Sequence, residues 1–148
     1  MVYAGIIALI FIGELFIKNH VEKNRKDGEE KEILQGRILL RKYHNKGACM
    51  NLGEKKRSVV AAVSLILTAV LTVVFLVTLT AKGNAWLKAG LSLLLGGAFS
   101  NTYDRLKRKY VVDYFSIQWK KLKDVVFNLG DIFVFAGSLI LLLRELFC

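Results

Sequence analysis

The sequence predicts an all-α integral membrane protein in which four transmembrane helices form a bundle. Hydrophobic residues make up 54% of the 148 positions, and the mean hydropathy is +0.42. These values are too apolar for an ordinary soluble domain. Four apolar runs cover approximately residues 2–18, 58–80, 86–103 and 125–143. Because the chain is too short for two domains of usual size, we expect residues 1–148 to form one membrane-embedded domain.

The first two runs are interpreted as transmembrane helices that are not cleaved. Residues 2–18 are not preceded by the basic segment of a cleaved signal peptide, so we expect a first helix that can extend beyond Lys18. Residues 58–80 carry no charge at any of their 23 positions. As an α-helix this run is about 34 Å long, which exceeds the ~30 Å thickness of the hydrocarbon core.

The third run, residues 86–103, combines small and polar side chains. Gly96 and Ser100 are four positions apart, a spacing that lets a neighbouring helix approach closely. Asn101 and Asp104 share one helical face, and Arg105 is adjacent to them. The carboxylate of Asp104 and the guanidinium of Arg105 could form a purely structural network, or they could contact a substrate.

Two polar segments connect the apolar runs, residues 19–57 and 105–124. Residues 38–43 mix apolar and basic side chains after a glycine, which predicts a short amphipathic strand at the membrane surface. Residues 45–47 are compatible with a simple turn or with part of a binding site. The apolar residues Tyr114, Phe115, Ile117 and Trp119 lie within this second basic segment, which favours an amphipathic segment lying on the surface.

The net charge of +10 is concentrated beside the apolar runs. Of the 22 basic residues, twelve lie within residues 18–57 and seven within residues 105–123. This placement favours membrane lipids with anionic headgroups as partners, and no nucleic-acid-binding motif accompanies it. By the positive-inside rule, the face carrying both segments would be cytoplasmic. Cys49 and Cys148 fall on opposite faces if all four runs span, and no Cys/His spacing indicates a metal site.

Asp113 and Asp131 are the strongest candidates for catalysis. Asp113 closes the apolar stretch VVD, and Asp131 lies inside the fourth run, where Asn128 should share its face about one turn inside the helix. An aspartate at a helix centre costs about 2.5–3.5 kcal/mol on insertion scales, so such a residue is a functional candidate. A four-helix topology brings both acids to one face. Two carboxylates about 4 Å apart repel by ~4 kcal/mol at an effective dielectric constant of 20, so one keeps its proton, as an aspartic protease requires.

Several sequence blocks resemble those of the signal peptidase II family. They are GGAFSNTYDR (96–105), VVDY (111–114) and FNLGD (127–131), in this order, with NKGA (45–48) upstream. Glu14 with Lys18 is similar to the acid and the lysine, four positions apart, in the first helix of the family. The resemblance covers nearly the whole chain. It implies a membrane aspartic endopeptidase that removes signal peptides from prolipoproteins, cutting before a diacylglyceryl-modified cysteine.

The same resemblance implies Asp113 and Asp131 as the catalytic pair, with no cofactor and no metal. It implies binding or supporting roles for the other candidates, which are Asn45, Gly47, Asn101, Asp104, Arg105, Asn128 and Glu14. It further implies a small extracytoplasmic sheet that cradles the substrate, and a multi-pass location in the cell membrane. In that orientation both termini are cytoplasmic and the active site is extracytoplasmic, opposite to the positive-inside expectation. The antibiotic globomycin, an inhibitor of the family, is expected to occupy the same cleft.

Three features depart from the pattern of the family. Glu14 stands where Asp is usual, Cys49-Met50 replaces a small residue and an aromatic one, and Gly130 stands where Ala is usual. These departures keep open the alternative of a family member that binds lipoprotein or lipid without cleaving it. A small proton or cation carrier using Glu14, Asp113 and Asp131 is a further alternative, although it would need acids staggered across the bilayer.

Overall fold

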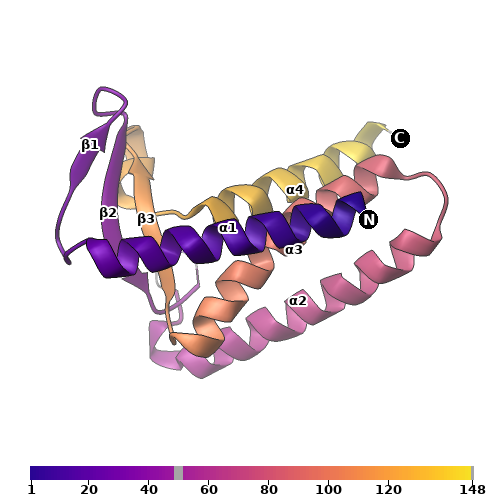
Figure 1. Cartoon of the computed structure of the whole chain (residues 1–148), viewed down its shortest axis with the longest axis horizontal. Helices are drawn as coiled ribbons and strands as arrows, with labels where there is room; N and C mark the ends of the chain where they lie inside the picture. Colours follow the sequence, from indigo (N-terminus) through magenta and orange to yellow (C-terminus); the bar gives the residue numbers. More distant parts are fainter. Residues whose placement is uncertain (49–51, 148) are drawn as a thin grey trace.

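The computed structural model describes residues 1–48 and 52–147. Four long helices extend from a small antiparallel sheet at one end of the molecule (Figure 1). The helices are α1 (Val2–Asn24), α2 (Arg57–Thr80), α3 (Ala85–Lys107) and α4 (Leu129–Phe147). The first residues of α1 and the last residues of α4 lie at the end opposite the sheet (Figure 1).

Two of the described helices, α1 and the segment Glu54–Thr80 that contains α2, are long and apolar enough to cross a membrane by themselves. The other two carry more polar groups. Six polar side chains of α3 are buried inside the molecule, namely Lys88, Ser92, Ser100, Asn101, Thr102 and Asp104. α4 contains three charged residues, Asp131, Arg144 and Glu145. The chain is therefore mostly helical, with strongly apolar first and second helices.

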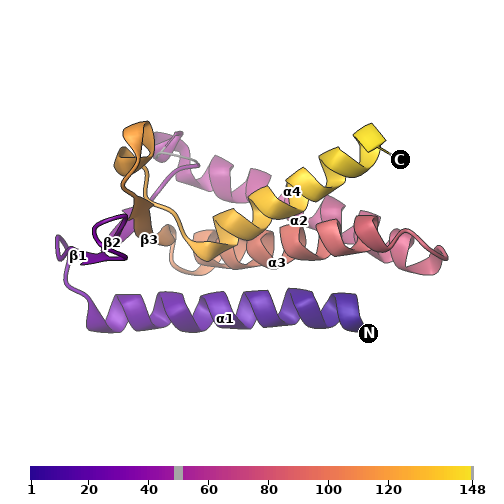
Figure 2. The same ribbon diagram turned by 90° about the horizontal axis from the view of Figure 1, so that it is seen from above.

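α3 lies between α1 on one side and α2 and α4 on the other (Figure 2). Glycines make these contacts close. A Cβ atom at Gly97 would lie 2.2 Å from the carbonyl oxygen of Gly130 in α4, and one at Gly96 would lie 2.7 Å from Cβ of Ile10 in α1. Any larger side chain at these positions would push the helices apart, so the small residues of α3 set the width of the bundle.

The sheet contains β1 (Lys31–Ile33), β2 (Ile38–Asn45) and β3 (Val111–Ile117) in the order β1-β2-β3, with both pairs antiparallel. β3 packs against the end of α1, where Val112 and Tyr114 form a buried cluster with Val21. The pairing of β2 with β3 places Asn45 opposite Val111. Because alternate strand residues share a face, Asn45 and Asp113 point to the same side of the sheet.

The observed elements differ from the sequence prediction at several boundaries. α1 continues to Asn24, α3 continues to Lys107, and the predicted strand at 38–43 extends to Asn45. α4 begins at Leu129 and not at residue 125, because Phe127 pairs with Phe115 as extended backbone. The segment predicted to lie on the surface at 114–119 instead contributes most of β3, whose first four residues are buried.

Candidate active site

Asp113 and Asp131 are joined through a third residue, Asn128. Nδ2 of Asn128 donates a hydrogen bond of 2.6 Å to Oδ1 of Asp113. The backbone N–H of Asn128 donates to Oδ2 of Asp131 at 3.2 Å, and the backbone N–H of Asp131 donates to Oδ1 of Asn128 at 2.9 Å. Asn128 therefore contacts both carboxylates, that of Asp113 in β3 through its side-chain amide and that of Asp131 in the first turn of α4 through its backbone N–H.

The local sequence explains this arrangement. Asn128 directly precedes α4 and Asp131 is its third residue, so the two exchange the reciprocal hydrogen bonds of a capping box. The apolar run at 125–143 predicts Asn128 about one turn inside the helix, and this prediction is wrong because α4 begins at Leu129. The start of α4 cannot be recognised from hydropathy, because residues 125–127 are as apolar as the helix that follows them.

The second hydrogen bond to each carboxylate comes from another asparagine. Nδ2 of Asn45 donates to Oδ2 of Asp113 at 3.1 Å, and Nδ2 of Asn101 donates to Oδ1 of Asp131 at 2.8 Å. All four carboxylate oxygens thus accept a hydrogen bond from an asparagine. Such contacts fix the position of each acid to within a narrow range of rotamers.

Arg105 connects the helices to the loop after β2. Nη2 of Arg105 donates to the carbonyl oxygen of Gly47 at 3.3 Å, and Nη1 donates to the carbonyl oxygen of Asn101 at 3.3 Å. The N–H of Gly47 donates in turn to Oδ1 of Asn45 at 3.1 Å. The predicted residues of NKGA and of the third helix therefore meet at the two acids, although they are far apart in sequence.

A cavity of about 310 Å³ opens beside these groups, a size at the lower end of that of small-ligand pockets. Its polar wall contains Asn45, Arg105, Asp113 and Asp131. Its apolar wall is formed by side chains from β3, from the segment before α4 and from α4 itself, namely Val111, Val125, Val126, Phe127, Val134 and Phe135. The cavity offers an extended, partly apolar chain a place next to the two carboxylates.

Burial, followed by the negative charge of Asp131, raises the pKa of Asp113 from its ordinary value of 3.8 to about 7. The hydrogen bonds from Asn128 and Asn45 oppose this increase. The side chain of Asp113 is only 1% exposed, so desolvation of the charged form dominates. Asp113 is therefore suited to hold a proton near neutral pH.

Behind the two acids lies a buried cluster of charges around Lys18. Nζ of Lys18 is 3.4 Å from Oε2 of Glu14 and 3.2 Å from Oδ2 of Asp104. The same ammonium donates to Oγ of Ser100 at 2.9 Å and to Oδ1 of Asn101 at 2.8 Å. Glu14 is only 2% exposed, so its carboxylate lies inside the protein and not at the membrane interface, where an acid near the end of an apolar run could also lie.

Asp104 does not anchor Arg105 through an ion pair, as one interpretation of the sequence had it. Its carboxylate instead pairs with Lys18 and with Arg108, whose Nε lies 3.0 Å from Oδ1 of Asp104. It also accepts a hydrogen bond of 3.1 Å from the N–H of Val112 in β3. Asp104 thus ties α3 to α1 and to the strand that carries Asp113.

Tyr114 is a site residue that the sequence analysis assigned to the surface. Its hydroxyl donates a hydrogen bond of 2.5 Å to Oε1 of Glu14 and accepts one of 3.0 Å from the N–H of Leu129. Burial, and then the charge of Glu14, raises the pKa of Tyr114 above its usual range, so the hydroxyl stays protonated. The one signal in the sequence is that Tyr114 directly follows Asp113. Successive residues of a strand face opposite sides, so Tyr114 points away from the face that carries Asp113 and packs with Val21 of α1.

Comparisons with known proteins place this arrangement in a family. A family model described as "Signal peptidase (SPase) II" matches residues 6–147. The chain belongs to the signal peptidase II family. Relatives include proteins named lipoprotein signal peptidase from Caldicellulosiruptor bescii, 34% identical over 95% of this chain and 88% of the relative, and from Lactobacillus johnsonii, 27% identical over 98% and 92%.

Solved structures share the fold. One described as a bacterial membrane enzyme superimposes with a TM-score of 0.84 at 20% sequence identity, and covers 98% of this chain and 87% of the other. A second with the same description has a TM-score of 0.83, also at 20% identity, and covers 99% and 93%. The arrangement of helices and sheet is thus a known one. Of the three departures noted in the sequence, Glu14 and Gly130 lie inside the site, whereas Cys49-Met50 lies outside the described residues.

Proposed function

We propose that this signal peptidase II family member is an aspartic endopeptidase, and that Asp113 and Asp131 are its catalytic pair. The observation that carries the proposal is the bridge through Asn128, which contacts both carboxylates at the wall of one cavity. Two adjacent acids that share a proton can supply a base and an acid to the same reaction. The names of the relatives support a lipoprotein precursor as substrate, and the resemblance of the sequence blocks implies cleavage before its diacylglyceryl-modified cysteine.

In the mechanism we propose, the two acids have separate roles. Asp131 accepts hydrogen bonds from Asn101 and from the N–H of Asn128, which favour its ionised form. As a carboxylate it draws a proton from a water molecule that attacks the scissile carbonyl carbon. Asp113, with its raised pKa, donates a hydrogen bond to the carbonyl oxygen as negative charge develops there.

The substrate backbone would lie along the polar wall of the cavity. Arg105 and Asn45 can hold peptide carbonyl groups near the two acids, and Gly47 leaves room for the chain beside Asn45. The apolar wall, from Val111 to Phe135, suits the signal peptide and the acyl chains of the modified cysteine. Globomycin-type inhibitors would compete for the same surface and contact Asn45, Asn101, Arg105 and Asn128.

We propose that all four helices cross the cell membrane and that the sheet lies on the extracytoplasmic side, where exported precursors arrive. The sheet lies at one end of the bundle and both ends of the chain lie at the other (Figure 1), which supports an even number of crossings, and the choice of side follows from where exported precursors arrive. Residues 1–148 would then form one peptidase domain. All three candidate relay acids, Glu14, Asp113 and Asp131, belong to one connected cluster, which does not favour a carrier with acids staggered across the bilayer.

The decisive experiment measures cleavage of a lipidated precursor by the purified chain in detergent. Asp113→Asn and Asp131→Asn keep the side-chain volume but remove the acid, so cleavage should fall by roughly 10²–10⁴-fold or more. Helical content and elution volume would show that each variant is folded. Asp104→Asn is the control, because it should lose thermal stability and much less activity. Substantial cleavage by either folded dyad variant would refute the aspartic mechanism.

The same assay separates the proposal from a family member that binds without cleaving. Such a protein would retain lipidated precursor but release no signal peptide, even with the unaltered chain. Adding globomycin should block cleavage by the unaltered protein. Arg105→Ala and Asn128→Ala should each weaken both cleavage and inhibition, and if neither changes, the proposed substrate contacts are incorrect.

A further inference from the structure

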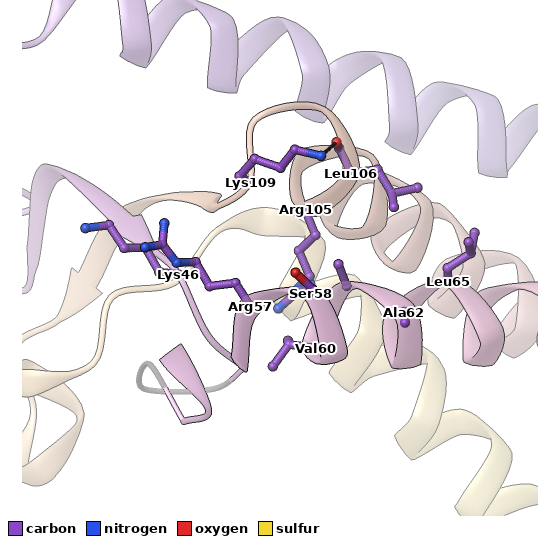
Figure 3. A pocket seen from close by; sticks show the side chains of 10 residues that line it. Lys46, Arg57, Ser58, Val60, Ala62, Leu65, Arg105, Leu106 and Lys109 are labelled. Atoms are coloured by element: carbon purple, nitrogen blue, oxygen red, sulfur yellow. Dashed lines mark hydrogen bonds between the residues drawn. The ribbon is translucent and has the colours of Figure 1, made fainter. Parts of the chain in front are cut away.

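A second and larger cavity, of about 500 Å³, lies between the start of α2 and the end of α3 (Figure 3). Four basic side chains line it, and none of the lining residues in the described part of the chain is acidic. These cations are Lys46, Arg57, Arg105 and Lys109. The floor is apolar and is formed by Val60, Ala61, Ala62, Leu65 and Leu106. We call this cavity the basic cleft.

The start of α2 adds a further attraction for an anion. Within the described residues, no side chain caps the N-terminus of this helix. α2 continues directly from the 3-10 helix Glu54–Lys56, so this end of α2 offers an anion the guanidinium of Arg57 and the hydroxyl of Ser58, and no free helix N-terminus.

The basic cleft changes from charged to apolar along its length. Figure 3 shows Lys46 and Arg57 at one end and Leu65 at the opposite end, with Arg105 and Lys109 between them. Lys109 is held by a hydrogen bond of 2.8 Å from its ammonium to the carbonyl oxygen of Leu106. Beyond the cleft, the outer side of α2 remains apolar and exposed at Val63 and Ile66. This order of groups matches a molecule with an anionic head and a hydrocarbon tail.

From this geometry we propose that the basic cleft binds an anionic phospholipid. Its phosphate would lie among the basic side chains and the first turn of α2, and one acyl chain would follow the apolar floor onto α2. The charged end sits where the apolar run of α2 begins, which is the depth of a headgroup if this helix spans the membrane. A zwitterionic headgroup fits less well, because its own cation would meet four others. The proposal does not depend on the proteolytic activity.

The basic cleft is close to the catalytic cavity. Arg105 lines both, and its guanidinium is already anchored to Gly47 and to the carbonyl oxygen of Asn101. A lipid phosphate in the basic cleft would therefore lie against the rear of the wall that holds Asp113 and Asp131. Bound lipid would stabilise this wall without occupying the space next to the acids.

Native mass spectrometry of the full chain in detergent tests the proposal by titration with three probes. They are phosphatidylglycerol, phosphatidylcholine with the same acyl chains, and glycerol phosphate. We expect phosphatidylglycerol to bind at least tenfold more tightly than either of the others. The paired substitution Arg57→Gln and Lys109→Gln should weaken its binding roughly fivefold per cation. Both side chains are exposed, so folding should be unaffected.

Two controls separate the basic cleft from general surface charge. Lys55→Gln with Lys56→Gln removes the same charge next to the cleft but outside its lining, and should change binding little. Ala62→Phe keeps every charge but fills the apolar floor, and should weaken lipid binding. The proposal is overturned by any of three results. These are equal losses of phosphatidylglycerol affinity in the two paired variants, unchanged affinity with Ala62→Phe, and binding of glycerol phosphate that is as tight as that of phosphatidylglycerol.

Discussion

The ammonium of Lys18 donates a hydrogen bond of 2.8 Å to Oδ1 of Asn101. Because this oxygen is engaged by a cation, the amide is oriented with Nδ2 towards Asp131, to which it donates at 2.8 Å. Lys18 is fully buried between the carboxylates of Glu14 and Asp104. A lysine of the first helix thus sets the geometry of an acid of the fourth without touching it.

We expect Lys18→Met to slow cleavage at least tenfold per folded molecule, mainly through kcat, because Asn101 can then rotate away from Asp131. The same change leaves the buried carboxylate of Glu14 without its counter-charge and removes one of the two cations that pair with Asp104, and it should cost about 3–5 kcal/mol of stability. Lys18→Gln, whose amide can still donate to Asn101, should recover part of kcat. Ser100→Ala removes the other hydrogen-bond acceptor of Lys18 and serves as the control, with little effect on kcat. Normal turnover by folded Lys18→Met would contradict the positioning role.

The raised pKa of Asp113 predicts a pH dependence of both activity and stability. In the unfolded chain the carboxyl titrates near 3.8, and in the folded chain near 7. The folded state therefore binds the proton more tightly, so the stability contributed by Asp113 is complete below about pH 3.8 and is lost as the pH rises through 7. Cleavage should fall over the same upper range, as Asp113 loses the proton that it donates.

Asp113→Asn resembles the protonated acid at every pH. We expect this variant to be inactive, yet more stable than the unaltered chain at pH 8, by at most about 4 kcal/mol. At pH 4 the two proteins should unfold at similar temperatures. Thermal unfolding in detergent at several pH values measures the difference, and an Asp113→Asn protein that is less stable at pH 8 would show that burial does not disfavour the charge.

The proposed orientation can be tested by labelling single cysteines. The native Cys49 and Cys148 lie outside the described residues, so both are replaced by serine. Lys123→Cys introduces an exposed thiol at the sheet end, and Lys82→Cys introduces one at the opposite end. A membrane-impermeant maleimide on intact cells should label only Lys123→Cys, and both should react after the membrane is disrupted. Labelling of Lys82→Cys alone in intact cells would favour the positive-inside rule.

Much of the helical arrangement follows from apolar run length. The run at 58–80 predicts α2 to within one residue, because a charge-free stretch of this length has few other stable states. The start of α4 could not be found in this way. Val125 and Phe127 are apolar and have high strand propensity, and only the pairing of Phe127 with Phe115 decides that they are extended.

The site was predictable where polar residues interrupt apolar runs. Asp113, Asp131, Asn101 and Arg105 stand out by this criterion, and the structure brings them together. Their partners were harder to predict. Because Arg105 is adjacent to Asp104 in sequence, it was the expected ion-pair partner of this carboxylate. Helix periodicity instead places Arg108 one turn later on the same face as Asp104, and the two form an ion pair. Tyr114 is buried because α1 covers one side of β3, and the local sequence around Tyr114 does not predict this long-range packing.

Glu14 and Gly130 are neighbours in space, although they are separate departures from the family pattern in the sequence. A Cβ atom at Gly130 would lie 3.3 Å from Oε2 of Glu14 and 2.8 Å from Oδ1 of Asn128. Space for the longer acid thus comes partly from the missing methyl group. Gly130→Ala should therefore displace the side-chain amide of Asn128, which donates a hydrogen bond to Asp113, one of the two proposed catalytic acids.

We expect Gly130→Ala to destabilise the chain by about 1–3 kcal/mol, as overpacking does, and to reduce cleavage. Glu14→Asp should also destabilise, because the shorter acid withdraws from the hydroxyl of Tyr114. The two changes together should cost less than their sum, with a coupling of about 0.5–3 kcal/mol, because aspartate vacates the space that the alanine methyl enters. Gly90→Ala provides the control, since it crowds Leu141 between α3 and α4, and should add to Glu14→Asp without coupling. The measurement is a double-mutant cycle, in which thermal unfolding and cleavage are compared for the unaltered chain, the two single variants and the double variant. Strict additivity of Glu14→Asp with Gly130→Ala would mean that the two departures are unrelated.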